Sequence, residues 1–322
     1  MYVLGIDGGG TKTTGVIANG RGEVQAMYTV RSTNPNVVKK SILQKELSTL
    51  FTALQKQNRY AFSHLQRVFA AMSGVDHSDH KKEMKQIIHD LLPNSIPVDV
   101  DNDAVAALYS GTYGAFGVVQ IAGTGSITYG INDEEKRGRV GGWGHLIDER
   151  GSGFSIGSLG LREAFSAYDR GIKTLLEEKL LNYFSISSLP ELVQHIYRGP
   201  NPKETVASLS RLIIQAADEK DRVAQRIIRE NGQYMGESIV RLIQKLFKQI
   251  DEDREIPIVF AGGLFHRFDL FRHSVEEVMQ KYPFKTRFII PVIEPVGGSV
   301  IAALRRENIS IHDDFPDVFH LS

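Results

Sequence analysis

The chain has 322 residues, and its 38 lysines and arginines balance 38 aspartates and glutamates, so the formal net charge is zero. A neutral chain is not expected to bind nucleic acid or an acidic surface through bulk charge. The absence of cysteine excludes disulfides, zinc thiolate sites and cysteine-held iron–sulfur clusters. No leader pattern and no uncharged apolar run of 18 residues is visible, so we expect a cytoplasmic protein without a membrane partner.

The first part of the chain is predicted to form an α/β domain over residues 1–111. Apolar runs between glycine turns predict three consecutive strands, at 2–7, 12–18 and 23–30. Leucines at helical spacing predict a helix over 37–57. The elements expected next are a strand at 68–72, a helix at 80–91, a strand at 98–100 and a helix at 103–109. This order is that of a ribonuclease-H-like domain, whose sheet is mixed at its edge and parallel in its centre.

A second ribonuclease-H-like domain is predicted over 112–322, and its first strand is expected to begin near residue 116. Helices are predicted across 158–183, 189–198, 203–217 and 221–249. Strands at 256–261 and 286–290 are expected to close its sheet, and a helix at 298–305 ends the regular part. Because no low-complexity linker separates the halves, we expect a hinge between two packed domains.

Residues 6–13, which read Ile-Asp-Gly-Gly-Gly-Thr-Lys-Thr, predict a phosphate-binding loop between two strands. Glycines let the backbone approach a phosphate and turn its N–H groups inward. A P-loop and a Rossmann loop each open a helix, whereas a strand follows here, and an ordinary hairpin needs fewer glycines. Asp7 is expected to hold a magnesium ion, directly or through water. The predicted phosphate-binding residues are Gly8, Gly9, Gly10, Thr11, Lys12 and Thr13.

The segment 116–130 repeats this pattern of strand, Gly/Thr turn and strand. When Gly123 is aligned with Gly10, Thr124 falls on Thr11, and Gln120 stands where the first copy has Asp7. A pattern that recurs once suggests two halves of related architecture, whose loops would hold the phosphates of one nucleotide from both sides. The predicted nucleotide-binding residues of the second half are Gly123, Thr124 and Gly125, with Gly262 and Gly263 after the strand at 256–261.

These loops, together with the Ser-Thr-Asn at 32–34, the Asn-Asp-Ala at 102–104 and the Gly-Gly-Trp-Gly-His at 141–145, resemble the actin-like ATPase and sugar kinase superfamily. More narrowly, they are similar to the N-acetylglucosamine kinase and N-acetylmuramate kinase branch of the BadF/BadG/BcrA/BcrD ATPase family. The resemblance runs from residue 1 to about residue 305. It implies an α/β, actin-like ATPase fold with two ribonuclease-H-like domains around an interdomain cleft. It also implies ATP and Mg²⁺ as cofactors, and a homodimer.

Asp103 follows the apolar run 96–100 and opens a predicted helix. Asp101 and Asp103 are both candidates for capping that helix, because aspartate is a preferred N-cap residue. The resemblance instead implies that Asp103 is the catalytic base, which takes the proton of a sugar hydroxyl and also contacts the sugar.

Two further segments are predicted to bind the sugar. Asn34 precedes a proline, so a turn explains it without a ligand, whereas the resemblance implies a hydrogen bond to a sugar hydroxyl, which suits an amide that donates and accepts. Trp143 is the single tryptophan, and a lone tryptophan is usually a core residue. Because glycines flank it, the resemblance implies that Gly142, Trp143 and Gly144 form a loop around a hexosamine.

The segment Asp-Glu-Arg-Gly-Ser at 148–152 departs from the family pattern Gly-Asp-Glu-Gly-Ser. Glu149 stands in place of the family's sugar-binding aspartate. Arg150 either favours an anionic, lactyl-bearing sugar or pairs with a neighbouring carboxylate on the surface. Ala207 matches the position where a family helix approaches the nucleotide, although an alanine in a helix needs no special reason.

From the resemblance we expect an ATP-dependent kinase that phosphorylates the C6 hydroxyl of an N-acetylated amino sugar, N-acetylglucosamine or N-acetylmuramate, in the recycling of cell-wall sugars. An ATPase that activates a partner enzyme is one alternative, but such activators hold a cluster on cysteines that this chain lacks. A non-catalytic, sugar-sensing ATP-binding protein of the same fold is the other.

Overall fold

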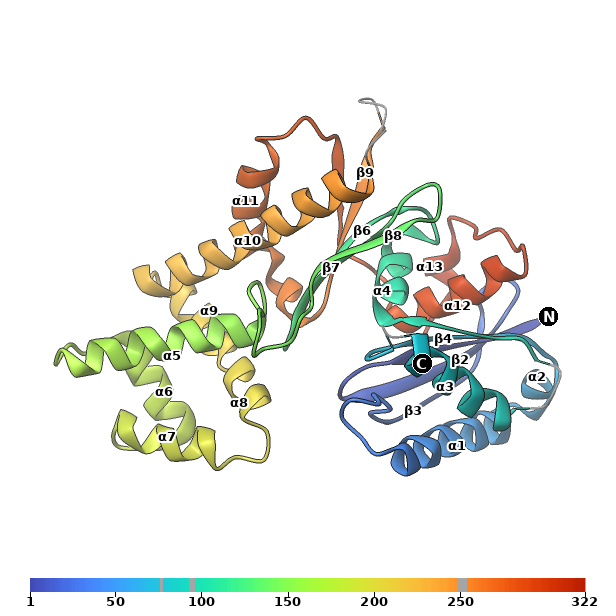
Figure 1. Ribbon diagram of the computed structural model, residues 1–322, viewed down its shortest axis with the longest axis horizontal. Coiled ribbons are helices and arrows are strands. Elements are labelled where there is room, and N and C mark those ends of the chain that lie inside the picture. Colours follow the sequence, from blue (N-terminus) through green and yellow to red (C-terminus); the bar gives the residue numbers. More distant parts are fainter. Residues whose placement is uncertain (76–77, 93–95, 248–253, 322) are drawn as a thin grey trace. The chain divides into compact units, whose positions relative to one another are not determined.

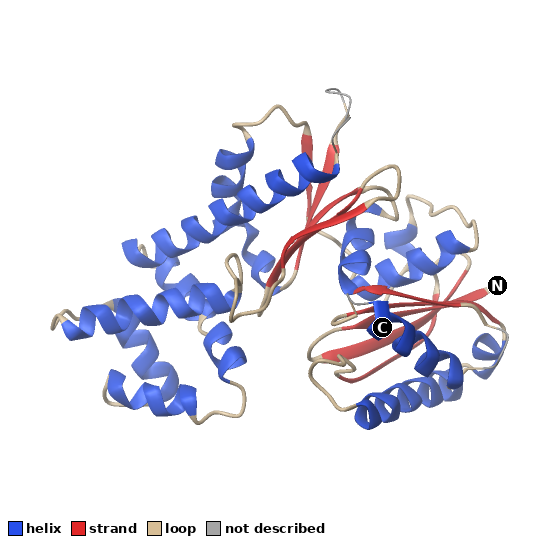
Figure 2. Cartoon of the chain, in the orientation of Figure 1, coloured by secondary structure: helices blue, strands red, loops and turns tan. Residues whose placement is uncertain are grey.

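Each half of the chain forms a five-stranded sheet with helices packed against it (Figure 1). The computed structural model describes residues 1–75, 78–92, 96–247 and 254–321, and Figure 2 marks their helices and strands. The chain divides into two compact units: unit 1 contains Met1–Gly117 and Ile289–Ser322, and unit 2 contains Val118–Phe288. The last part of the predicted second domain therefore packs with the N-terminal unit. Within the described ranges, none of the helices has both the length and the apolar character needed to span a bilayer.

Unit 1 contains a mixed sheet whose strands lie in the order β3-β2-β1-β4-β5. Their bounds are β1 Tyr2–Gly8, β2 Lys12–Asn19, β3 Val24–Arg31, β4 Leu65–Met72 and β5 Val98–Asn102. Strand β2 runs antiparallel to β1 and β3, whereas β4 runs parallel to β1 and β5. In this register Gly8 pairs with Met72, and Met72 pairs with Asn102. The three parallel strands therefore end side by side, as the sequence predicts.

Helices α1 and α12 form much of the packing around this sheet. The predicted leucines of α1 are buried in the unit 1 core, and the Ser299 hydroxyl of α12 donates to the Ile6 carbonyl of β1 over 2.9 Å. Helices α12 and α4 cross closely at Gly298, where a Cβ atom would lie 1.9 Å from the Ala106 carbonyl oxygen. The bounds of the unit 1 helices are α1 Lys40–Gln57, α2 Arg59–Ser63, α3 Ser78–Asp90, α4 Asp103–Thr112, α12 Pro295–Arg306 and α13 Phe315–Val318.

Unit 2 repeats the strand order of unit 1. Its sheet has the order β10-β9-β6-β7-β8, with β6 Gly117–Ala122, β7 Ser126–Ile131, β8 Arg137–Gly141, β9 Ile256–Ala261 and β10 Thr286–Ile289. In each sheet the first strand in sequence is central, the second and third lie on one side of it, and the fourth and fifth lie on the other. This correspondence confirms the predicted architectural repeat.

Helices make up most of the rest of unit 2 (Figure 2). The stretch predicted over 158–183 is two helices, because Gly171 takes a left-handed conformation just after α5 ends. The stretch predicted over 203–217 is also two helices, which meet at Leu209. The final residues of the helix predicted over 221–249, Lys248 and Gln249, lie outside the described residues. The bounds are α5 Gly153–Asp169, α6 Leu175–Phe184, α7 Leu189–Tyr197, α8 Pro202–Ser208, α9 Ser210–Asp218, α10 Arg222–Leu246, η1 Gly263–Arg267 and α11 Phe268–Met279.

Candidate active site

The first glycine loop is a tight turn between the antiparallel strands β1 and β2. The Gly9 amide donates to the Lys12 carbonyl over 2.9 Å, and the Ser32 hydroxyl donates to the Gly9 carbonyl over 3.1 Å. Gly10, Thr11 and Lys12 are exposed, in accordance with a ligand-binding loop. Thr13 differs, because its buried hydroxyl shares a 2.7 Å hydrogen bond with Thr33. Thr13 therefore supports the loop from within the fold.

Asp7, next to the end of β1, lies near two other carboxylates and one ammonium group. Burial, the largest cause, together with the charges of Asp103 and Glu294 and against the opposing charge of Lys12, raises the pKa of its carboxyl from 3.8 to about 7. Asp7 of β1 therefore interacts with three charged groups within unit 1. They are Asp103 at the start of α4, Glu294 at the N-cap of α12, and Lys12 after the loop. Glu294 was not predicted, because only the return of α12 to this unit brings it here.

This environment fits a divalent cation. Mg²⁺ is usually bound by one or two protein carboxylates together with phosphate oxygens and water, rather than by a closed protein cage. The described residues contain no group of three or more histidines, aspartates and glutamates arranged as such a cage. Asp7 offers hard oxygen donors, and burial and the nearby carboxylates Asp103 and Glu294 disfavour its ionised form in the absence of a cation.

Asp103 is the first residue of α4, but it is not the cap of that helix. The cap is Asn102, whose side-chain oxygen accepts a 2.8 Å hydrogen bond from the Ala104 amide. The Asp101 carboxylate accepts from Lys81 over 3.1 Å and from the Asn102 amide over 3.0 Å. The capping alternative for Asp101 and Asp103 is therefore wrong. Because Asn102 pairs with Met72 next to Gly8, the half-buried Asp103 lies at the same sheet edge as the glycine loop.

Asn34 is joined to this edge through one serine. Its side-chain nitrogen donates to the Ser73 hydroxyl over 3.0 Å, and the Ser73 amide donates to the Gly8 carbonyl over 2.7 Å. Its side-chain oxygen accepts from the Asn36 amide over 2.9 Å, which closes the turn expected before a proline. Among the described residues, each end of the amide retains one further hydrogen-bonding position, so the turn leaves Asn34 capacity for a ligand.

The second glycine loop joins β6 to β7 and contacts the start of α5. The Gly123 amide donates to the Gly125 carbonyl over 2.9 Å, and the Gly153 amide donates to the Gly123 carbonyl over 2.7 Å. Gln120 donates to the Ser126 hydroxyl over 2.9 Å and accepts from Thr128. Gln120, which stands in the place of Asp7, therefore links β6 to β7 next to the loop.

A pocket of about 670 Å³ in unit 2 is bounded by this loop, helices α8 and α9, and the segment that begins η1. Pockets of a few hundred Å³ are of the size that encloses small ligands. The lining includes four of the predicted nucleotide-binding residues, Gly123, Thr124, Ala207 and Gly263. Gly262 precedes Gly263 at the end of β9, which runs parallel to β6. The structure therefore brings together segments that are more than a hundred residues apart in the sequence.

Glu149 is 8% exposed and lies against the second loop. One carboxylate oxygen accepts from the Ser126 amide over 3.1 Å, and the other lies 3.4 Å from the Lys203 ammonium. Gly125 leaves room for this carboxylate, because a Cβ atom there would lie 2.8 Å from the Glu149 Oε2 atom. Lys203 was not predicted, since nothing in its local sequence links it to this loop.

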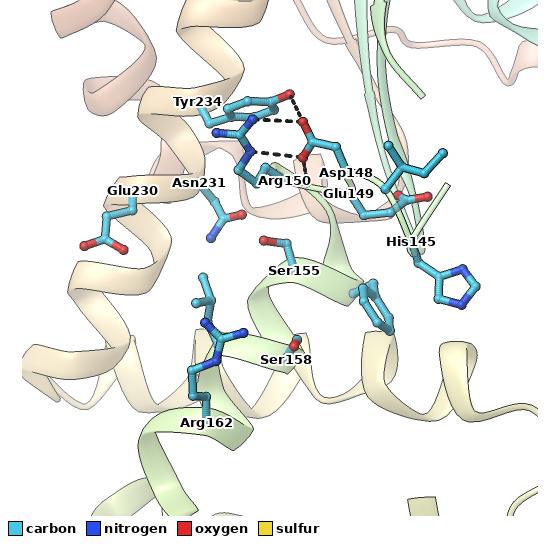
Figure 3. Close-up of a pocket in the computed structure, with 13 residues that line it drawn as sticks. His145, Asp148, Glu149, Arg150, Ser155, Ser158, Arg162, Glu230, Asn231 and Tyr234 are labelled. Carbon is cyan, nitrogen blue, oxygen red and sulfur yellow. Dashed lines mark hydrogen bonds and ion pairs between the residues drawn. The ribbon is translucent and has the colours of Figure 1, made fainter. Parts of the chain in front are cut away.

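Arg150 is engaged within a second pocket of about 560 Å³ (Figure 3). Its guanidinium donates to both carboxylate oxygens of Asp148 over 3.0 and 2.9 Å and lies over the Tyr234 ring, 4.3 Å from the centroid. The Arg150 hydrogen bond lowers the Asp148 pKa to about 2. The sequence left two interpretations of Arg150, a contact with an anionic sugar or an ion pair with a neighbouring carboxylate. In the structure Arg150 forms the ion pair, with Asp148.

The segment Gly142-Trp143-Gly144 follows β8 as a loop. Both glycines have positive φ angles, 71° and 90°. Trp143 is 55% exposed, and the Arg139 guanidinium lies 4.2 Å from the centroid of its ring. Trp143 is therefore not a core residue, and its indole is accessible for stacking.

The chain is similar in sequence to one ATPase family and to two amino-sugar kinases. The family model described as the BadF/BadG/BcrA/BcrD ATPase family matches residues 4–303. N-acetylmuramic acid/N-acetylglucosamine kinase from Clostridium acetobutylicum is 30% identical over 94% of this chain and 98% of its own length. N-acetyl-D-glucosamine kinase from Dictyostelium discoideum is 31% identical over 94% of this chain and 97% of its own length.

Solved structures share the fold. A Chromobacterium violaceum protein proposed to be an N-acetylglucosamine kinase aligns with a TM-score of 0.72 and 19% identity over 93% of this chain and 98% of that chain. A ROK family glucokinase from Streptomyces griseus, solved with glucose and AMPPNP, aligns with a TM-score of 0.61 and 17% identity over 94% and 98% of the two chains. The predicted α/β sugar kinase and actin-like ATPase fold is thereby confirmed.

Proposed function

The chain belongs to the BadF/BadG/BcrA/BcrD ATPase family, and we propose that it is an ATP-dependent kinase that phosphorylates the C6 hydroxyl of an N-acetylated amino sugar. The two relatives that cover nearly the whole chain carry names of N-acetylglucosamine and N-acetylmuramic acid kinases. The observation that carries the proposal is in unit 1. Asn102, not Asp103, caps α4, and Asp103 interacts electrostatically with Asp7 beside a glycine loop.

The nucleotide is assigned to two sets of residues. In unit 2, the 670 Å³ pocket would take the nucleoside, with Ala207 and Gly263 at its walls, Gly262 just before Gly263, and loop 123–125 at the phosphates. In unit 1, the loop amides of 8–10 and the side chains of Thr11 and Lys12 would bind the phosphate chain, with Thr13 as support. Asp7 would hold Mg²⁺, which neutralises phosphate charge when bound.

The residues proposed to bind the sugar are Asn34 in unit 1, and the loop 142–144 and Glu149 in unit 2. Asn34 would bind a hydroxyl with the donor and acceptor positions its turn leaves open. The loop Gly142-Trp143-Gly144 would lie against the hexosamine, because an exposed indole flanked by glycines presents a flat apolar face. Glu149 would contact a sugar hydroxyl.

The proposed reaction is a direct transfer. The C6 oxygen of the sugar forms a bond to the γ-phosphorus of ATP, the bond from that phosphorus to the bridging oxygen breaks, and ADP leaves. Asp103 accepts the proton of the C6 hydroxyl, so the products are a sugar 6-phosphate, ADP and one proton. A positioned base of this kind contributes roughly 10²- to 10⁴-fold in rate, and Lys12 with the loop amides stabilises charge on the transferring group.

We place this activity in the cytoplasm, where ATP is available, within the recycling of cell-wall sugars. A homodimer is proposed as the assembly, and neither nucleic acid nor a membrane is proposed as a partner.

The test is the Asp103→Asn variant, assayed for sugar-dependent ADP formation and for ATP binding. We expect a loss of roughly 10²- to 10⁴-fold in kcat with ATP affinity retained. Asp90→Asn is the matched control, because it makes the same charge change at an exposed position of α3. Unchanged activity in Asp103→Asn would contradict the assignment, and a wild-type protein that binds ATP and sugar without turnover would favour a sensor.

A further inference from the structure

The second glycine loop lacks the lysine of the first. When Gly10 is aligned with Gly123, the residue that falls on Lys12 is Gly125. A loop that binds phosphates through backbone amides alone has less positive charge than its counterpart. The two copies of the repeat therefore differ at the position that supplies an ammonium group in unit 1.

In the structure, an ammonium group reaches the second loop from α8. The Lys203 Nζ atom lies 3.4 Å from Glu149 Oε1, and Glu149 Oε2 accepts from the Ser126 amide over 3.1 Å. One carboxylate thus links the lysine to the residue that immediately follows Gly125. The missing side chain of Gly125 leaves the space that this carboxylate occupies, since a Cβ atom there would lie 2.8 Å from Oε2.

The same helix forms a wall of the 670 Å³ pocket. Lys203 and Ala207 are four residues apart on α8 and so lie on one helical face. Ala207 lines the pocket together with Gly123 and Thr124 of the loop. Lys203 is therefore on the helix that lines the pocket and is tied through Glu149 to the loop, and every residue concerned belongs to unit 2.

The contact between Lys203 and Glu149 leaves the ammonium able to bind a second anion. Ammonium–carboxylate hydrogen bonds are usually about 2.7–2.9 Å long, so 3.4 Å is a loose pairing. The Lys203 side chain is 31% exposed, whereas that of Glu149 is 6% exposed. Because the Ser126 amide also holds Glu149, the carboxylate stays in place, and the more exposed Lys203 ammonium, which has three donors, can bind an anion without leaving it.

We propose that Lys203 binds the phosphate chain of ATP beside the second loop, in the role that Lys12 has at the first, and that Glu149 is the positioning residue that holds it there. The proposal rests on the proposed function for the identity of the anion. It also gives Glu149 a role besides the sugar contact assigned above.

The experiment compares ATP with adenosine, because only ATP carries the phosphates. Binding to the full chain is measured by titration calorimetry with Mg²⁺ and without sugar, for wild type, Lys203→Met, Lys203→Gln and Lys203→Arg. Loss of a charge-assisted contact should weaken ATP binding roughly 10- to 100-fold in the Met and Gln variants, with adenosine affinity unchanged. Lys203→Arg should retain most of the ATP affinity, because the positive charge is kept.

Two further variants test the role of Glu149 and provide a control. Glu149→Gln keeps an acceptor for the Ser126 amide but loses the ion pair, so we expect a smaller, ATP-selective loss that higher salt diminishes. Lys173→Met is the matched control, because it removes an exposed lysine from the segment between α5 and α6 of the same unit, and both affinities should remain those of wild type.

Wild-type ATP affinity in both Lys203→Met and Lys203→Gln would overturn the proposal, as would an equal loss of ATP and adenosine binding. A change confined to the KM for sugar would also overturn it. These outcomes are distinct from failure of the proposed function, in which the wild-type protein itself would bind no ATP or phosphorylate no sugar.

Discussion

Replacing Asp7 by asparagine should stabilise the folded chain at neutral and alkaline pH, although it removes a proposed metal-binding group. Burial, followed by the charges of Asp103 and Glu294, raises the pKa of Asp7 from 3.8 to about 7, against the opposing effect of Lys12. An asparagine of almost the same shape carries no charge at any pH. The variant therefore isolates the cost of ionising this one group.

The sign and the size follow from proton linkage. Between about pH 4 and 7 the folded chain keeps a proton on Asp7 that the unfolded chain has lost, so the free energy of unfolding falls as the pH rises. At about 1.4 kcal/mol per pKa unit, a shift of about three units costs about 4 kcal/mol above pH 7. Because the Asp7 side chain is only half-buried, we take this as an upper limit.

The assay is urea denaturation, followed by circular dichroism between pH 5 and 8.5, of wild type and Asp7→Asn. The difference in unfolding free energy between the variant and wild type should grow as the pH rises from 5, and should be constant above about pH 7.5. Asp90→Asn, at an exposed site, should show no such trend. A difference that does not change with pH, or a variant less stable than wild type at pH 8, would refute the reasoning.

Two other substitutions test the scaffold around Asp103. Gly298→Ala should push α4 and α12 apart, because its Cβ would lie 1.9 Å from the Ala106 carbonyl oxygen. We expect the free energy of unfolding, measured by heat or urea, to fall by about 1–3 kcal/mol. Gly20→Ala is the control, because open space surrounds Gly20, and it should not change the stability in this way. Asn102→Ala removes the 2.8 Å cap bond to the Ala104 amide and should cost about 1 kcal/mol of stability. It should also lower kcat without changing ATP affinity, and an unaltered kcat would show that the cap does not position Asp103.

Much of the sheet structure could be predicted because its signals are local. Strand β9 is an apolar run whose residues are all buried, and the first glycine loop separates two strands whose central residues are buried. Strand β8 gave no comparable signal, since its residues Arg-Gly-Arg-Val-Gly are exposed or half-buried. Its strand conformation depends on pairing with β7, in which Tyr129 lies opposite Arg139, and such a partner cannot be identified from five residues.

In the candidate site, too, only the residues that belong to a local pattern could be predicted. The glycine loops and Asp103 could be found because each belongs to a short motif, whereas Glu294 and Lys203 could not. Glu294 acts on Asp7 only because α12 returns to pack on β1. Lys203 reaches the second loop only through Glu149, 54 residues earlier in the chain. Contacts of this kind depend on tertiary packing, which leaves no local pattern.

The most direct test of the proposed kinase is to identify its product. The full chain is incubated with Mg²⁺, ATP and, in separate reactions, N-acetylglucosamine, N-acetylmuramate, glucosamine and N-acetylmannosamine, and the sugar is analysed by mass spectrometry and ³¹P NMR. We expect one 6-phosphorylated sugar for each ADP released with N-acetylglucosamine, N-acetylmuramate or both. ADP release without a sugar phosphate, or transfer to glucosamine alone, would contradict the account.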